Sequence, residues 1–102
     1  MRSSRNARTG VAYSLCNLGV AVLERGEPGH ASELHEESLR LYEALHDTAG
    51  QAFALINLGD VARSLGEEGR AVSLYEEALA LHRELGNERG ISRALKRLGA
   101  QG

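Results

Sequence analysis

Four histidines are the first side chains to test for chemistry, and they stand at His30, His35, His46 and His82. Neutral imidazole is the commonest protein ligand of metal ions, so a cluster of histidines would indicate a metal site. His30 and His35 are five positions apart, which puts them on different faces of a helix. The segment HEES that begins at His35 is not the zinc-protease motif, because Leu39 stands where that motif has its second histidine. We therefore expect no metal ion and no cofactor.

Two pairs of adjacent carboxylates, Glu36-Glu37 and Glu76-Glu77, are the other candidates for chemistry, as a general acid and base. The pairs recur in matching contexts, which is typical of the solvated face of a repeated helix rather than of a catalytic dyad. Cys16 lies outside any nucleophile motif, so we expect it to behave as a small buried apolar residue. The Gly-Lys-Ser/Thr sequence of a phosphate-binding loop is absent. We predict that the chain is not an enzyme.

The composition disfavours several further classes of protein. The single cysteine cannot form an internal disulfide, so the chain is not a disulfide scaffold. No apolar run approaches the ~18 residues of a membrane span, and no apolar core follows the basic segment MRSSRNAR. We therefore expect a cytoplasmic location and no membrane contact. The net charge is −2 and aromatic residues make up only 4%, which disfavours nucleic acid, although both ends of the chain are basic.

An internal repeat organises the elements that would position any site. The sequence NLG stands at 17–19 and again at 57–59, forty residues later, and many neighbouring positions also coincide. We place one repeat at about 10–49, a second at about 50–89, and a half repeat or capping helix at about 90–102. The whole chain, 1–102, is then a single domain.

Each repeat has the spacing of two helices. Leu55, Leu58, Ala62 and Leu65 recur at intervals of three and four residues, and Gly66 ends the run as a glycine after a helix does. The connections are short, which makes neighbouring helices antiparallel, and no strand pattern is present. Pro28 is suited to begin a helix, and Asp47 and Asn87 to cap the helices that follow them. The predicted all-α fold has about five helices, at about 7–25, 28–45, 48–65, 68–85 and 88–100.

A glycine recurs inside the first helix of each unit, at Gly19, Gly59 and Gly99. Glycine inside a helix costs about 1 kcal/mol relative to alanine, so its repetition needs a reason. We expect it to allow close approach of the partner helix, with Ala31 facing Gly19 and Ala71 facing Gly59.

These residues resemble the tetratricopeptide repeat, whose signature is a large residue, Leu-Gly, a bulky residue, Ala, an aromatic residue and Ala. The sequence departs from that pattern in having leucine for its tryptophan, Arg83 for its closing proline, and a period of forty residues. Units of this length are similar to those of bacterial regulators and scaffold proteins. The second repeat supplies the signature as Leu55, Leu58, Gly59, Ala62, Gly66, Ala71, Tyr75 and Ala78.

The resemblance implies an antiparallel helix-hairpin solenoid that binds a protein, peptide or helix in a concave groove lined by the first helix of each pair. It thus implies a non-catalytic protein–protein interaction module, either an adaptor or part of a larger bacterial regulator. Carried over to matching positions, the groove residues are Tyr13, Cys16, Asn17, Val20, Phe53, Ile56, Asn57, Asp60, Arg63, Arg93, Lys96 and Arg97.

Three alternatives remain open at this level. Tyr13, Phe53 and Ile56 could pack between repeats instead of facing a ligand, and the cations of the half repeat could simply solubilise a capping helix. The basic ends could contact nucleic acid in a helical repeat of that class. The open ends of the solenoid could join copies of the chain into a homo-oligomer or self-assembling scaffold.

Overall fold

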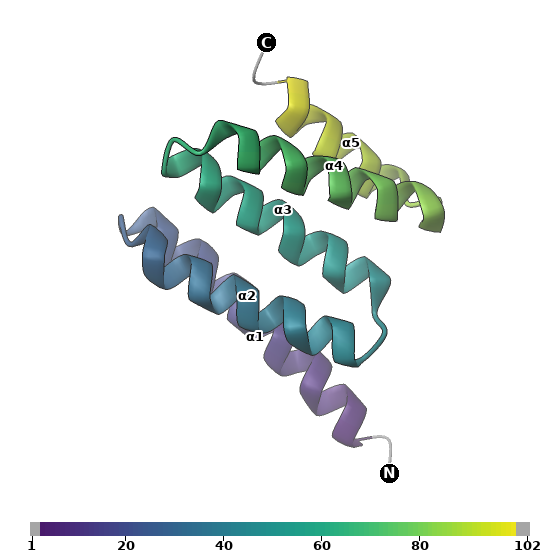
Figure 1. Cartoon of the computed structure of the whole chain (residues 1–102). Helices are drawn as coiled ribbons and strands as arrows, with labels where there is room; N and C mark the ends of the chain where they lie inside the picture. Colours follow the sequence, from purple (N-terminus) through teal and green to yellow (C-terminus); the bar gives the residue numbers. More distant parts are fainter. Residues whose placement is uncertain (1–2, 100–102) are drawn as a thin grey trace.

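Five α-helices make up the part of the chain that the computed structural model describes, residues 3–99 (Figure 1). The predicted bounds of the second to fourth helices are correct to within one residue, and the predicted end of the fifth, residue 100, lies outside the described residues. The first helix begins four residues earlier than predicted. There the Arg5 guanidinium donates to the Leu45 carbonyl at 2.6 Å, which ties the first turns of this helix to the end of the second. The helices are α1 (Ser3–Glu24), α2 (Pro28–Ala44), α3 (Thr48–Ser64), α4 (Glu68–Leu85) and α5 (Glu88–Gly99).

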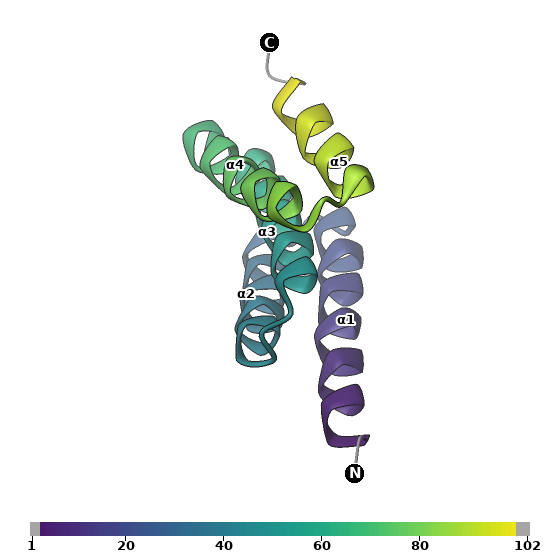
Figure 2. The same ribbon diagram turned by 90° about the vertical axis from the view of Figure 1, so that its right-hand side faces the viewer.

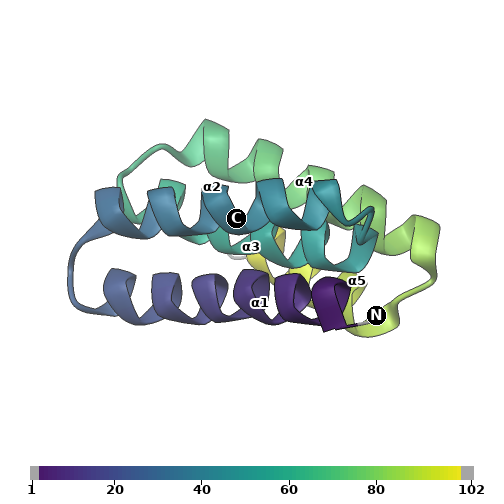
Figure 3. The same cartoon turned by 90° about the horizontal axis from the view of Figure 1, so that it is seen from below.

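The helices form two antiparallel hairpins, α1–α2 and α3–α4, with α5 packed after them. Each helix packs most closely against its neighbours in the chain (Figure 1). In Figure 2, α1 and α5 lie on the right and α2 and α4 on the left, and in Figure 3, α1 and α2 run side by side in separate layers. Helix α3 also approaches α1 and α5, whereas the backbones of α2 and α4 stay further apart within residues 3–99 and these two helices meet through side chains, as where Arg70 lies 3.8 Å from Glu36. The solenoid therefore curves toward α1, α3 and α5, and we call their surface the inner face.

The turns show why the helices end where the sequence predicts. Gly26 and Gly66 follow the first helix of each hairpin with φ of 84° and 78°, a left-handed conformation that glycine adopts without strain. Gly86 adopts the same conformation after α4, with φ of 66°, but the matching residue after α2 is His46, with φ of 54°. The next helix starts with a side-chain cap, since Asp47 accepts the Gly50 N–H at 2.9 Å. This cap confirms one of the sequence predictions.

Two glycines inside the first helices of the hairpins, Gly19 and Gly59, lie under the rings of neighbouring side chains. A Cβ added to Gly59 would lie 2.5 Å from Cε1 of Tyr75, and one added to Gly19 would lie 2.6 Å from Cε1 of His35. The predicted reason, close approach of a partner helix, is therefore correct, but the atoms nearest to each glycine belong to the rings of His35 and Tyr75 and not to the predicted Ala31 and Ala71. A ring sixteen residues on reaches across to the glycine.

A second set of ring contacts joins each hairpin to the helix that follows it. The Tyr42 ring of α2 packs against Gly50 of α3, and the His82 ring of α4 packs against Gly90 of α5. Each of α2 and α4 thus carries one ring for the helix before it and one for the helix after it.

None of the five helices in residues 3–99 has both the length and the apolarity that a membrane span requires.

Candidate functional site

Two stacked aromatic side chains form the apolar part of the inner face. Tyr13 of α1 and Phe53 of α3 have ring centroids 5.9 Å apart and planes inclined by 26°. Tyr13 is 55% exposed and Phe53 is half-buried, so the pair is open to solvent across the α1–α3 junction. Exposed aromatic rings of this kind supply contact area at low entropic cost when a partner binds.

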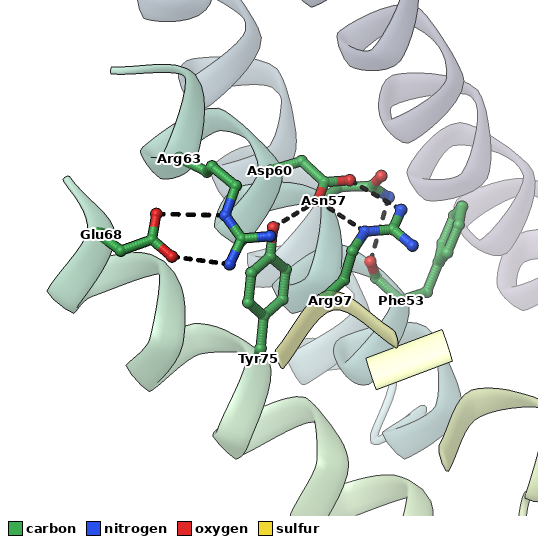
Figure 4. Close-up of polar contacts among 7 residues, drawn as sticks. All are labelled: Phe53, Asn57, Asp60, Arg63, Glu68, Tyr75 and Arg97. Atoms are coloured by element: carbon green, nitrogen blue, oxygen red, sulfur yellow. Dashed lines mark hydrogen bonds and ion pairs between the residues drawn. The ribbon is translucent and has the colours of Figure 1, made fainter. Parts of the chain in front are cut away.

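A carboxylate on α3 joins three helices beside this ring pair. Asp60 Oδ1 accepts the Tyr75 hydroxyl at 2.6 Å and the Arg97 Nε–H at 2.9 Å, and its Oδ2 accepts from Arg97 Nη2 at 3.0 Å (Figure 4). Burial, followed by the hydrogen bond to Asp60, raises the pKa of Tyr75, so the hydroxyl remains a donor. The hydrogen bonds to Asp60 raise the pKa of Arg97 in turn. The network fixes α4 and α5 to the middle helix.

Arg63 extends the same network along α3. Its Nε and Nη2 donate to the Glu68 carboxylate at 3.2 and 2.8 Å, which raises the pKa of the arginine. The guanidinium carbon also lies 5.0 Å from the centroid of the Tyr75 ring, within cation–π distance (Figure 4). The Arg63 and Arg97 side chains are therefore already paired with carboxylates.

Arg93 and Lys96 of α5 are exposed, as are Asn17 and Val20 of α1. The inner face thus changes along its length, from aromatic and apolar side chains on α1 and α3 to cations on α5.

Three of the predicted groove residues do not lie open on this face. Cys16 is 0% exposed, and its Sγ lies 3.0 Å from Oγ of Ser38 on α2; burial raises the pKa of the thiol. Ile56 is 2% exposed within the core cluster that includes Tyr75. One residue turns a helix by about 100°, so these positions are rotated about 60° from Tyr13 and Phe53, toward the packing partner.

Asn57 is the third of these residues, with 8% exposure, and its Nδ2 donates to the Phe53 carbonyl at 3.1 Å. Its side chain also lowers the pKa of the Cys16 thiol of α1, against the larger effect of burial, which places it near the α1–α3 junction. Asn17 occupies the matching position on α1 but is exposed, because no helix precedes α1 in the described chain. The structure therefore corrects the prediction at Cys16, Ile56 and Asn57.

Sequence reasoning assigned no role in the site to Tyr75 and Glu68, which both come from α4. The aromatic pattern at Tyr75 indicated a core ring, but no local signal indicates that its hydroxyl reaches Asp60.

Within the described residues, no group of three His, Cys, Asp or Glu side chains could hold a metal ion.

The match to known families agrees with this architecture. The family model described as tetratricopeptide repeat matches residues 11–84, which is more than half of the chain. The chain belongs to the tetratricopeptide repeat family. Proteins of this family generally mediate protein–protein interaction. No curated protein sequence matches the chain.

Proposed function

We propose that this tetratricopeptide repeat chain binds a peptide segment or helix of another protein along its inner face and carries out no reaction. The observation that supports this most directly is the solvent-exposed stack of Tyr13 on Phe53, 5.9 Å between centroids. Large aromatic side chains left exposed in this way are enriched among residues that dominate protein–protein binding.

The charges beside the ring pair define the other half of the proposed contact. Arg93 and Lys96 are exposed at the α5 end of the inner face, whereas Arg97 is held by Asp60. A partner would therefore place an apolar side chain on Tyr13 and Phe53 and carboxylates near Arg93 and Lys96. In this proposal the module acts as an adaptor or as part of a larger bacterial regulator.

Selection of peptides on the immobilised chain tests this proposal. Peptides from a random displayed library are selected on the wild-type chain and their affinities are measured for Tyr13→Ala and Phe53→Ala. We expect each variant to bind at least about tenfold more weakly, the effect of about 1.4 kcal/mol at a contact residue. Leu18→Ala is the matched control, because Leu18 is a 49% exposed residue of α1 outside the predicted set.

Equal affinity for the wild-type chain and both ring variants would reject the inner face as the binding site. The salt dependence of binding distinguishes a nucleic acid ligand from the proposed peptide ligand. Binding of a single-stranded oligonucleotide that weakens steeply with salt and is lost on Arg93→Ala with Lys96→Ala would favour nucleic acid instead.

A further inference from the structure

A pocket of about 110 Å³ opens between the two hairpins, where the end of α3 and the start of α4 meet α2, and we call it the turn pocket. Its apolar lining is Leu58, Val61, Ala62 and Leu65. The first three belong to α3 and are at most 4% exposed, whereas Leu65, in the turn after α3, is 49% exposed. An apolar cavity of about 150 Å³ holds a benzene ring, so the turn pocket has room for one aliphatic side chain.

Two of the lining residues differ from their counterparts forty positions earlier, in the first hairpin. Ala62 stands where the first hairpin has Val22, and since both side chains are buried, the second hairpin lacks two methyl groups at this point. Leu65 stands where the first hairpin has Arg25, at the same place after a helix, and both are exposed. Arg25 shows that this turn forms without a leucine. The second hairpin therefore has both a gap in its packing and an exposed leucine beside that gap.

The charged groups at the edge of the turn pocket leave one carboxylate unpaired. Arg70 Nη2 lies 3.8 Å from Oε2 of Glu36 on α2, and the Ser32 hydroxyl donates to the same oxygen at 3.4 Å. Glu67 is exposed, makes no side-chain cap for α4, and has no ion pair within residues 3–99. The edge thus carries two carboxylates and one guanidinium, with its negative charge at Glu67.

The charges of the neighbouring turns have the same sign. Arg63 is paired with Glu68. The segment 24–33 around the α1–α2 turn, which lies on the same side of the molecule as the α3–α4 turn (Figure 1), has three glutamates against one arginine and one histidine.

The two outer helices extend this acidic surface. Helix α2 carries four glutamates and one arginine, and α4 carries four glutamates and two arginines, whereas α5 carries four cations and one glutamate. A basic segment is therefore attracted to the side of the molecule that α2 and α4 form and is repelled by α5.

We infer that the turn pocket docks a short basic segment of a partner protein, which places one leucine side chain in the pocket and a lysine or arginine beside Glu67. The leucine would bury the exposed surface of Leu65 and fill the space that Ala62 leaves. The cation at the edge supplies selectivity, because an acidic segment would be opposed by Glu67 and Glu36. Neither Tyr13 nor Phe53 lines this pocket, so the inference does not depend on the function proposed above.

A synthetic peptide of sequence Gly-Lys-Lys-Leu-Lys-Lys-Gly, acetylated and amidated at its ends, serves as the probe. Its binding to the whole chain is followed by the methyl resonances of the protein. We expect saturable shifts at Leu58, Val61 and Leu65. Binding should be at least about tenfold weaker when alanine replaces the leucine of the peptide, and weaker again when glutamates replace its lysines.

Two variants give the second hairpin the residues of the first. Ala62→Val should fill the turn pocket, and Leu65→Arg should remove its exposed wall and repel the lysines, so each should weaken binding at least about tenfold. Glu67→Gln should weaken it only about threefold, because an exposed ion pair contributes little. Leu85→Arg is the matched control: Leu85 lies at the other end of α4, is equally exposed (47% against 49%), and should leave the affinity unchanged. Urea unfolding of each variant shows that it is folded.

Four results would overturn this inference. The first is the absence of saturable shifts with the lysine peptide, and the second is an affinity that neither Ala62→Val nor Leu65→Arg changes. The third is tighter binding of the glutamate peptide that is lost in Arg70→Gln, which would assign the pocket to an acidic segment. The fourth is self-association of the chain that Leu65→Arg removes, seen by sedimentation, which would assign the pocket to a second copy.

Discussion

The two hairpins place different chemistry in the same position. In the second, the Tyr75 ring covers Gly59 and its hydroxyl donates to Asp60, which also holds Arg97 of α5. In the first, His35 covers Gly19, and the residue matching Asp60 is Val20. His35 is 1% exposed and its Nδ1 is buried without a hydrogen-bond partner.

The comparison separates two contributions of one ring. The apolar contribution, contact between ring and glycine, is present in both hairpins. The polar contribution is present only in the second hairpin, where one carboxylate connects α3, α4 and α5. A buried polar atom without a partner destabilises a fold, so the first hairpin should be the weaker of the two.

The largest difference is expected when the rings themselves are removed. Tyr75→Ala should lower the free energy of unfolding by about 3–5 kcal/mol, because it empties a fully buried ring site and deprives Asp60 of a donor. His35→Ala should cost clearly less, because it also removes the unpartnered Nδ1. Urea unfolding followed by far-ultraviolet circular dichroism measures both, and equal losses would contradict the difference between the hairpins.

Removing only the polar contribution should have a smaller effect. Asp60→Val gives the second hairpin the residue of the first, and we expect it to cost about 1–2 kcal/mol because Tyr75 and Arg97 lose a charged acceptor that is partly exposed. Val20→Ala is the control on α1, and a change within about 0.5 kcal/mol is expected there. If Asp60→Val left the free energy of unfolding unchanged, the ring contact alone would account for the stability of the second hairpin.

Acid should act on the first hairpin through His35. Burial lowers the pKa of His35, and the Asp60 carboxylate only partly opposes this shift. Below about pH 6.5 the unfolded chain binds a proton that the folded chain resists, so the free energy of unfolding falls as the pH falls. His35→Phe should reduce this loss between about pH 7.5 and pH 5, measured by urea unfolding across that range.

His82 contributes to the same acid sensitivity from the second hairpin. Burial and the nearby Arg93 lower its pKa. The loss that remains in His35→Phe should therefore diminish further in the double variant with His82→Phe. An identical pH profile for the wild-type chain and the double variant would exclude the buried histidines as the cause.

The smallest difference concerns the turns that end the two hairpins. His46 and Gly86 occupy matching positions with φ of 54° and 66°, and only glycine adopts this region without strain. His46→Gly should raise the free energy of unfolding by about 0.5–1 kcal/mol, and Gly86→Ala should lower it by a similar amount. Thermal melts of the two variants should shift in opposite directions.

The helices were predictable because their signals are local. Pro28, Asp47 and the glycines after the helices mark boundaries within a few residues. The early start of α1 was not predictable, since it rests on a hydrogen bond from Arg5 to Leu45 that joins residues forty apart.

The candidate site was predictable only as a set of helix positions. Tyr13 is exposed and Phe53 is half-buried, whereas Cys16 and Ile56 are buried, because a 60° rotation about a helix axis decides between solvent and core. The pairing of Asp60 with Arg97 joins residues 37 apart on different helices, and no periodic pattern records it. The sequence does not show which side chains reach across a helix junction to pair with one another.

The positions of the rings over the glycines predict the order in which the helices open locally. Helix α3 packs under two rings, Tyr42 at Gly50 and Tyr75 at Gly59, whereas α1 and α5 each pack under one ring. Amide protons of α3 should therefore be the slowest to exchange with deuterium, and local opening should begin at the outer helices and move inward. Helix α3 is therefore expected to open last, and the local opening that would release a bound protein starts at the outer helices.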